Sequence, residues 1–159
     1  MCESAMSDNE LRVMKIRFGT VIDHINSGTS LSVLRILGLT GKGENVVTIA
    51  MNVPSRKIGR KDIVKVEDRV LSSEEADKIA LIAPKATINI IRDYAVVGKQ
   101  TIKLPQVVRG LVKCDNLSCI SNGKEPIQST FFVEGADPLR LRCYYCNRTM
   151  SKDDVLKQF

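Results

Sequence analysis

The segments Cys114-Asp115-Asn116-Leu117-Ser118-Cys119 and Cys143-Tyr144-Tyr145-Cys146 decide how the C-terminal third of this chain folds. Four residues separate the cysteines of the first pair, two separate those of the second, and 23 residues lie between the pairs. Thiolates are soft ligands that suit Zn²⁺, and two short knuckles joined by a hairpin can place four sulfurs at tetrahedral corners. The spacing predicts one structural zinc ion held by Cys114, Cys119, Cys143 and Cys146.

Two other interpretations of these cysteines stay open. Disulfides are one, although a cytosolic chain usually keeps such thiols reduced. Iron in a four-cysteine site is the main competitor of zinc. Four sulfur ligands leave no position for water or substrate, so the metal would be structural and would supply on the order of 10 kcal/mol of folding free energy. Cys2 has no partner at such a spacing and is interpreted as incidental.

The composition is that of a soluble globular protein. Of 159 residues, 43% are apolar and 26% charged, which fits one ordinary domain or two small ones. The longest apolar run falls short of the roughly 18 to 20 residues of a membrane span, and the first residues lack the features of a secretion signal. We therefore expect a cytoplasmic protein without a membrane partner.

The net charge of +6 raises the question of nucleic acid. Residues 1–100 carry 15 basic and 12 acidic residues and the remainder 9 and 6, so the excess is not concentrated. A nucleic-acid-binding protein more often has a basic stripe or interleaved aromatic residues, and nucleic acid is not expected here. The densest basic cluster, Arg56, Lys57, Arg60 and Lys61, fits either a solvated turn or a site for a smaller anion such as a nucleotide phosphate.

The first 102 residues carry the pattern of an α+β domain. Ser30 is the predicted cap of a short helix, and Ser72 with Glu75 forms a capping box at the start of a second helix that Pro84 closes. Alternating or β-branched runs predict strands at 12–18 (continuing to 25), 46–53, 62–67, 86–91 and 94–99, with the first helix at 31–37. This order predicts a ferredoxin-like split βαβ fold: an antiparallel sheet with two helices on one face and one added strand.

The predicted domain boundary follows Lys99, where the composition of the sequence changes. Lys103-Leu104-Pro105 resembles a connector, and the cysteines begin soon after it. We therefore expect one domain at 1–102 and a small zinc-binding β domain with four cysteine ligands at 103–159.

The sequence argues against an active site. His24 is the single histidine and lies next to Asp23. Adjacent residues on a strand point to opposite faces, so Asp23 is not expected to orient His24 as a catalytic partner would. The phosphate-loop, dinucleotide, HExxH and deaminase motifs are absent from the sequence. We predict that the chain is not an enzyme.

Several ordered segments together resemble one family, the regulatory chain of aspartate carbamoyltransferase. They are 19–25, 52–55, 59–65, 83–89, 94–99, 114–121 and 143–146, and the match runs from about residue 11 to the end. The resemblance implies a non-catalytic subunit of an enzyme of pyrimidine biosynthesis. Its allosteric domain would bind nucleotide triphosphates, and its zinc domain would dock on the catalytic chain. It also implies a dimer of regulatory chains within a larger hetero-oligomer, with ATP and CTP as expected effectors and UTP as a further candidate.

The same resemblance implies the nucleotide pocket. Lys65 and Lys99 would meet the polyphosphate as point charges, His24 would add a donor, and Asp23 would accept from ribose hydroxyls. The implied polar residues are Asp23, His24, Lys65, Asn89, Tyr94 and Lys99, and Val13, Ile16, Val21, Ile91 and Val96 would line the base and ribose.

One alternative belongs to another functional class. A zinc ribbon that binds nucleic acid, joined to a ligand-sensing domain, would also account for the cysteines and the basic balance. Phosphate-backbone binding weakens steeply with salt, so a salt titration discriminates the two hypotheses.

Overall fold

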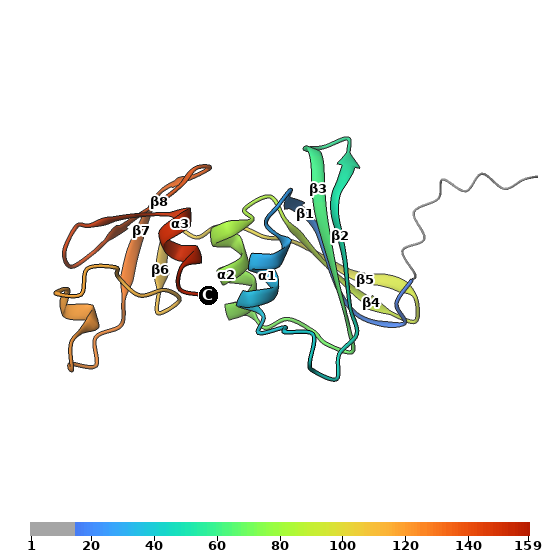
Figure 1. The fold of residues 1–159 in the computed structure, drawn as a ribbon, viewed down its shortest axis with the longest axis horizontal. Coiled ribbons are helices and arrows are strands. Elements are labelled where there is room, and N and C mark those ends of the chain that lie inside the picture. The colour runs from blue at the N-terminus through green and yellow to red at the C-terminus, as the bar shows by residue number, and fades with distance from the viewer. Residues whose placement is uncertain (1–14) are drawn as a thin grey trace, which may run out of the picture.

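The computed structural model describes residues 15–159, which form two antiparallel sheets and a few short helices (Figure 1). The first part contains β1 (Phe18–Asn26), α1 (Ser30–Ile36), β2 (Val47–Ser55), β3 (Gly59–Glu67), α2 (Ser73–Ile82), β4 (Thr87–Arg92) and β5 (Ala95–Thr101). The second part contains β6 (Val107–Arg109), the 3-10 turn η1 (Ile120–Asn122), β7 (Thr130–Ala136), β8 (Leu139–Cys143), β9 (Thr149–Ser151) and α3 (Lys152–Leu156).

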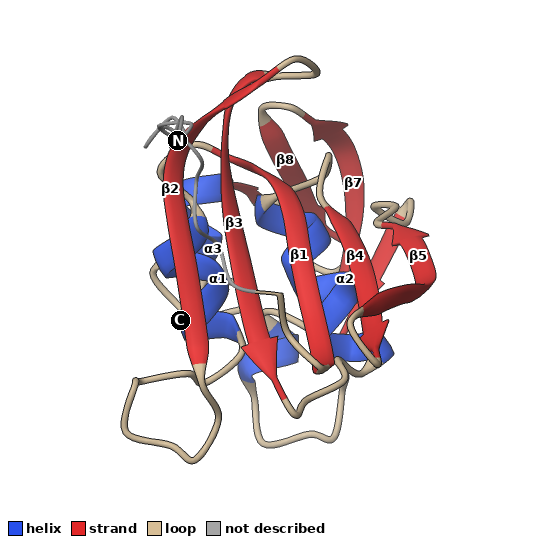
Figure 2. Ribbon diagram, turned by 90° about the vertical axis from the view of Figure 1, so that its right-hand side faces the viewer, coloured by secondary structure: helices blue, strands red, loops and turns tan. Residues whose placement is uncertain are grey.

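The five-stranded sheet has the order β2-β3-β1-β4-β5, and every neighbouring pair is antiparallel. Helices α1 and α2 cover one face of it, and Figure 2 shows the other face without a described helix. The C-terminal sheet has the order β6-β7-β8-β9. The predicted α+β class, a split βαβ sheet with one added strand followed by a small β region with four clustered cysteines, is confirmed.

The helices lie between the two sheets, and the interior is continuous across them (Figure 1). Fully buried side chains of the five-stranded sheet, of α2 and of the C-terminal sheet, such as Ile22, Ile79 and Phe131, belong to one cluster. Helix α2 also contacts α3. Two polar contacts join the same two parts: Lys152 Nζ lies 3.4 Å from Thr29 Oγ1, and Lys85 Nζ lies 3.9 Å from Asp137 Oδ2.

The capping box predicted for the second helix is present. The backbone N–H of Glu75 donates to Ser72 Oγ at 3.2 Å, and the N–H of Ser72 donates to the Glu75 carboxylate at 2.9 Å. The cap predicted for the first helix is wrong, because Ser30 is the first helical residue and Thr29 is the cap, without a side-chain hydrogen bond. The N–H of Ser30 donates instead to the carboxylate of Asp62, at 3.2 Å.

Two strand boundaries differ from the prediction. β1 begins at Phe18, after 15–17, while 12–14 lie outside the described residues. β2 does not stop at Pro54 but runs to Ser55, with Pro54 opposite Arg60. β2 is the edge strand, and Pro is tolerated on edge strands because alternate N–H positions there point away from the sheet.

The hairpin between β4 and β5 turns one residue later than predicted. Its two loop residues, Asp93 and Tyr94, have φ angles of 49° and 64°, as the tightest hairpins require. Tyr94 is therefore a turn residue rather than the first residue of a strand. Along residues 15–159, no helix is both long and apolar enough to cross a membrane.

Candidate effector face and metal centre

Four strands place one predicted pocket residue each in a single row across the sheet. Lys65 on β3 lies opposite Val21 on β1, Val21 lies opposite Asn89 on β4, and Asn89 lies opposite Lys99 on β5. Directly opposed residues project from the same face of a sheet. The next residue of β1, Ile22, is fully buried beneath the helices, so the row lies on the opposite face, which Figure 2 shows. We call this the effector face.

A small apolar area lies beside this row. Ile91 is opposite Gly19 on one side and Val96 on the other. Ile16 and Ile91 are buried, yet neither belongs to the core cluster beneath the helices. Val96 and the turn residue Tyr94 are exposed. The fold thus brings Ile91 and Val96 together near the lysines, while Val13 lies outside the described residues.

A bulge in β1 brings Asp23 and His24 to the same place. The β1–β3 register shifts between Ile22 and Ile25, and His24 has a φ angle of 57°. His24 Nδ1 lies 3.2 Å from Thr87 Oγ1, and Thr87 is the residue directly opposite Asp23 on β4. The same nitrogen lies 3.8 Å from Asp23 Oδ2. The prediction that the two side chains point to opposite faces is wrong, because a bulge interrupts the period-two alternation.

Positive charge gathers around this bulge. Lys61 Nζ lies 2.9 Å from Asp23 Oδ1. Burial lowers the pKa of His24, Asp23 raises it, and the charges of Lys61, Lys57 and Lys99 lower it further. Burial likewise lowers the pKa of Lys65. Several lysines therefore surround one imidazole, which is an arrangement suited to an anion.

Sequence reasoning placed Lys57 and Lys61 in a basic cluster but not in the pocket. The sequence contains a pattern that could have placed Lys61 on this face of the sheet. Lys61 is four residues from Lys65 on one strand, and period-two alternation places both on the same face.

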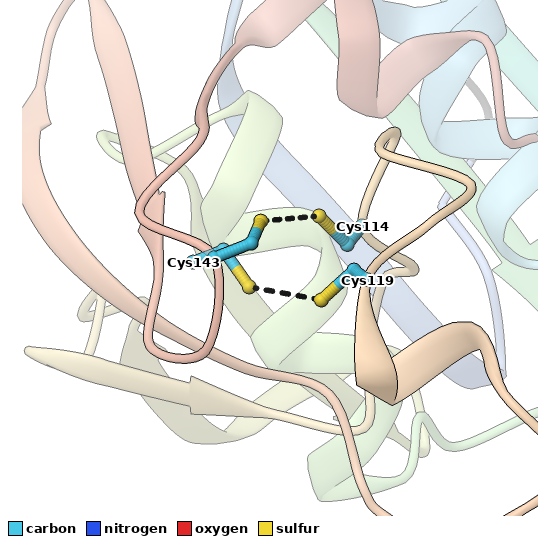
Figure 3. A group of neighbouring side chains, drawn as sticks. Cys114, Cys119 and Cys143 are labelled. Carbon is cyan, nitrogen blue, oxygen red and sulfur yellow. Dashed lines mark hydrogen bonds between the residues drawn. The ribbon is translucent and has the colours of Figure 1, made fainter.

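The four cysteines of the C-terminal part converge on one point (Figure 3). The Sγ atoms of Cys114 and Cys146 are 3.6 Å apart, those of Cys119 and Cys143 are 3.7 Å apart, and all four lie within 4.8 Å of one another. A disulfide would need about 2.05 Å, so these are free thiols. A tetrahedral cation with Zn–S bonds of about 2.3 Å would separate its sulfurs by about 3.8 Å. The sulfurs fit a four-coordinate metal.

Hydrogen bonds to backbone carbonyls fix the two knuckles. The Nδ2 group of Asn122 donates to the carbonyls of Cys114 and Asn116, each at 2.8 Å, which closes the first knuckle. In the second, the N–H of Asn147 donates to the carbonyl of Cys143 at 3.0 Å, and the N–H of Cys143 donates to the carbonyl of Arg148 at 2.9 Å. Each pair is therefore held in place by its own short loop.

The thiols differ in how readily they ionise. Burial raises the pKa of Cys114 and of Cys143. Burial also acts to raise the pKa of Cys146, but hydrogen bonds, first that from the Arg148 backbone, bring it to about 7. Because the buried thiols resist ionisation, a bound cation is what would hold all four as thiolates near neutral pH.

Comparison with known proteins covers both parts of the chain. A family model described as "Aspartate carbamoyltransferase regulatory chain, allosteric domain" matches residues 11–103. A second, "Aspartate carbamoyltransferase regulatory chain, metal binding domain", matches residues 106–156. The chain belongs to this family.

Regulatory chains of aspartate carbamoyltransferase from several organisms are similar to it over nearly their whole length. The regulatory chain of Methanothrix thermoacetophila is 56% identical over 147 residues, which cover 92% of this chain and 96% of that one. That of Saccharolobus solfataricus is 52% identical over 155 residues, 98% of each chain. That of Hyperthermus butylicus is 53% identical over 153 residues, 96% of each chain. The predicted family and the prediction of a non-catalytic, regulatory subunit are confirmed.

Proposed function

We propose that this regulatory chain binds nucleotide triphosphates on the effector face and thereby controls the catalytic chains of aspartate carbamoyltransferase. The observation that carries the proposal is the row of Lys65, Val21, Asn89 and Lys99 across four adjacent strands. ATP, CTP and UTP are the candidate effectors. The salt-sensitive nucleic-acid-binding alternative has no comparable observation in its favour.

The chemistry of the row suits a nucleotide. Neighbouring strands are about 4.8 Å apart, so a ligand lying across the row can touch side chains from several strands at once. Lys65 and Lys99 offer ammonium groups to a polyphosphate, and His24 adds a ring nitrogen beside them. Asp23 offers a carboxylate to ribose hydroxyls, and Ile91 and Val96 offer apolar contact to the base. Ile16, Tyr94 and, by resemblance, Val13 complete the proposed pocket.

We infer that the four-cysteine centre holds one structural Zn²⁺ per chain, with Cys114, Cys119, Cys143 and Cys146 as ligands. The sulfur separations near 3.8 Å and the lack of an open ligand position support this. Bound there, the ion would tie the loop after β6 to the turn between β8 and β9. A cytoplasmic location, where thiols stay reduced, agrees with this role.

We propose that residues 103–159 form the domain that docks on the catalytic chain, with 1–102 as the nucleotide-binding domain. A cavity of about 520 Å³ is lined partly by Phe132, Tyr144 and Tyr145. Tyr144 and Tyr145 lie inside the second cysteine knuckle and are 56% and 38% exposed. Exposed aromatic residues are enriched at protein interfaces. A surface built on the knuckle would exist only while the metal orders it.

A second regulatory chain is the other proposed partner. The edge strand β2 leaves one side of its backbone unpaired within the described part of the chain. Ile49 and Met51 on this strand are 36% and 48% exposed. An apolar, unpaired edge is suited to pairing with another chain, which supports a regulatory dimer within the larger assembly.

The experiment that tests the proposal removes the metal from the assembled enzyme with a thiol-reactive mercurial. Because the docking surface depends on the metal, this chain should separate from the catalytic chains. The released catalytic chains should still transfer carbamoyl groups but should ignore ATP and CTP. Adding this chain back with Zn²⁺ should restore the response.

Two results would contradict the proposal. Activity that disappears with this chain and returns only with it, even without nucleotides, would mean that the chain supplies part of the active site. Calorimetry in which the metal-loaded chain binds neither ATP nor CTP would refute the effector face.

A further inference from the structure

Asp62 is a carboxylate buried inside the first part of the chain and surrounded by backbone N–H groups. The whole of Asp62 is 0% exposed. Oδ1 accepts the N–H of Asn52 at 2.8 Å, and Oδ2 accepts the N–H groups of Gly28 at 3.0 Å and Ser30 at 3.2 Å. Burial acts to raise the pKa of Asp62, but its hydrogen bonds, that of Asn52 first, hold it below its ordinary value. The group is an anion satisfied chiefly by backbone.

The three donors belong to different segments of the chain. Asn52 lies where the β2–β3 register shifts and has a φ angle of 58°. Gly28 and Ser30 flank Thr29, the cap residue of α1, a helix that has no side-chain cap of its own. Asp62 itself lies opposite Ile25, the first residue of β1 after the bulge. One carboxylate therefore fixes an irregular point of β2, the end of β1 and the start of α1.

The residue next to Asp62 belongs to the effector face. Lys61 contacts Asp23 at 2.9 Å, and Asp23 with His24 forms the bulge. Lys61 and Asp62 are successive residues of β3, so one side chain faces the effector face and the other faces the helices. A shift of β3 at this point would move both.

The start of α1 also contacts the metal-binding part. Thr29 lies between the two residues whose N–H groups Asp62 accepts, and its Oγ1 lies 3.4 Å from Lys152 Nζ. Lys152 is the first residue of α3, which follows β9, and β9 pairs with β8, the strand that ends at Cys143. Val155 of α3 and Cys143 are both fully buried in the same cluster.

We propose that Asp62 is a positioning residue of the effector site and that, by holding the start of α1, it couples that site to the metal-binding part through the Thr29–Lys152 contact. The inference rests on the proposed binding of nucleotide to the effector face. Coupling between two sites needs an element whose position both of them bias, and the start of α1 is such an element.

The test measures CTP affinity by calorimetry, and the rate of Zn²⁺ release to a colorimetric chelator after mercurial addition, with and without saturating CTP. It uses the full metal-loaded chain. In the wild type, CTP should slow zinc release by about fivefold, at the lower end of usual coupling. Asp62→Asn puts an amide N–H where backbone N–H groups point, so it should weaken CTP binding by about tenfold and abolish the slowing.

Two further variants separate coupling from folding. Thr29→Val and Lys152→Met each remove one side of a single contact, so CTP affinity should stay within about twofold of wild type while the slowing of zinc release is lost. Lys85→Met removes a second polar contact between the two parts, with Asp137, and is the matched control that should keep both properties. If Asp62→Asn does not fold, Thr29→Val and Lys152→Met decide the matter.

The inference is overturned if Asp62→Asn binds CTP like the wild type, or if the slowing persists in Thr29→Val and Lys152→Met. A wild-type chain that binds CTP without any change in zinc release overturns this inference but leaves the proposed function standing. A wild-type chain that does not bind CTP refutes the proposed function, and this inference with it.

Discussion

Replacing Cys143 by Ser should unfold the metal-binding part of the chain while the five-stranded sheet remains folded. Cys143 is fully buried at the end of β8, and its Sγ lies 3.7 Å from that of Cys119. A hydroxyl is a poor ligand for Zn²⁺, so the centre would keep three thiolates and lose its closed geometry.

The size of the effect follows from how little regular structure this part contains beyond its packing against the helices. Strands β6 and β9 contain three residues each, and the long connection between β6 and β7 carries only the three-residue turn η1. A structural zinc ion contributes about 10–16 kcal/mol in zinc-finger peptides, whereas whole domains are stable by about 5–15 kcal/mol. Losing most of the metal's contribution would therefore remove more free energy than the other contacts of residues 103–159 can be expected to supply.

Elemental analysis and amide hydrogen exchange check this prediction. Zinc should fall well below one ion per chain, amides of β7 and β8 should lose protection, and amides of β1 and β3 should keep it. Cys2→Ser is the matched control, because it makes the same chemical change at the cysteine that the sequence spacing does not assign to the metal site, and it should retain the metal. A Cys143→Ser chain that holds one zinc ion and melts like the wild type would refute the reasoning.

Three other perturbations have defined outcomes. Lys65→Ala and Lys99→Ala should each weaken CTP binding about tenfold in calorimetry, because each removes a charge that would meet the polyphosphate in the proposed pocket; wild-type affinity in both would contradict that pocket. Because the pKa of His24 is lowered, the free chain should lose stability as pH falls below about 6.5, whereas bound phosphate favours the charged ring. CTP affinity should therefore rise between about pH 7 and pH 5.5, and His24→Gln should reduce that slope; an unchanged slope would exclude His24 from the site. Ser72→Ala should destabilise the chain by about 1 kcal/mol in urea unfolding by removing the capping box, and an effect no larger than that of Ser73→Ala would show that the box contributes nothing.

The features that the sequence predicts correctly depend on residues close together in the chain. The capping box of α2 needs only Ser72 and Glu75, and the two cysteines of each knuckle lie within six residues of sequence. Such patterns encode their own local geometry, so no knowledge of the sheet order is needed. That the two knuckles meet was inferred from their chemistry, and the sulfur distances confirm that they do.

The features that the sequence analysis missed depend on distant partners. Pro54 could be kept within a strand only because β2 is at the edge, which is a property of the sheet order. Nothing near Ser30 shows that its N–H is satisfied by Asp62, 32 positions away. The bulge at His24 depends on the pairing of β1 with β3. The effector residues were likewise assigned by family resemblance, because their convergence is set by the register of four strands.

The alternation along β3 separates the residues that maintain the core from the residues that face the proposed ligand. Asp62, Val64 and Val66 are buried beneath the helices, whereas the alternate residues Lys61, Ile63, Lys65 and Glu67 are only partly buried, on the other face. Under the proposed function, substitutions at the second set would change which nucleotide is preferred without disturbing the packing that the first set maintains. A lineage could thus retune its response to a changing nucleotide pool by single steps, each of which leaves the scaffold intact.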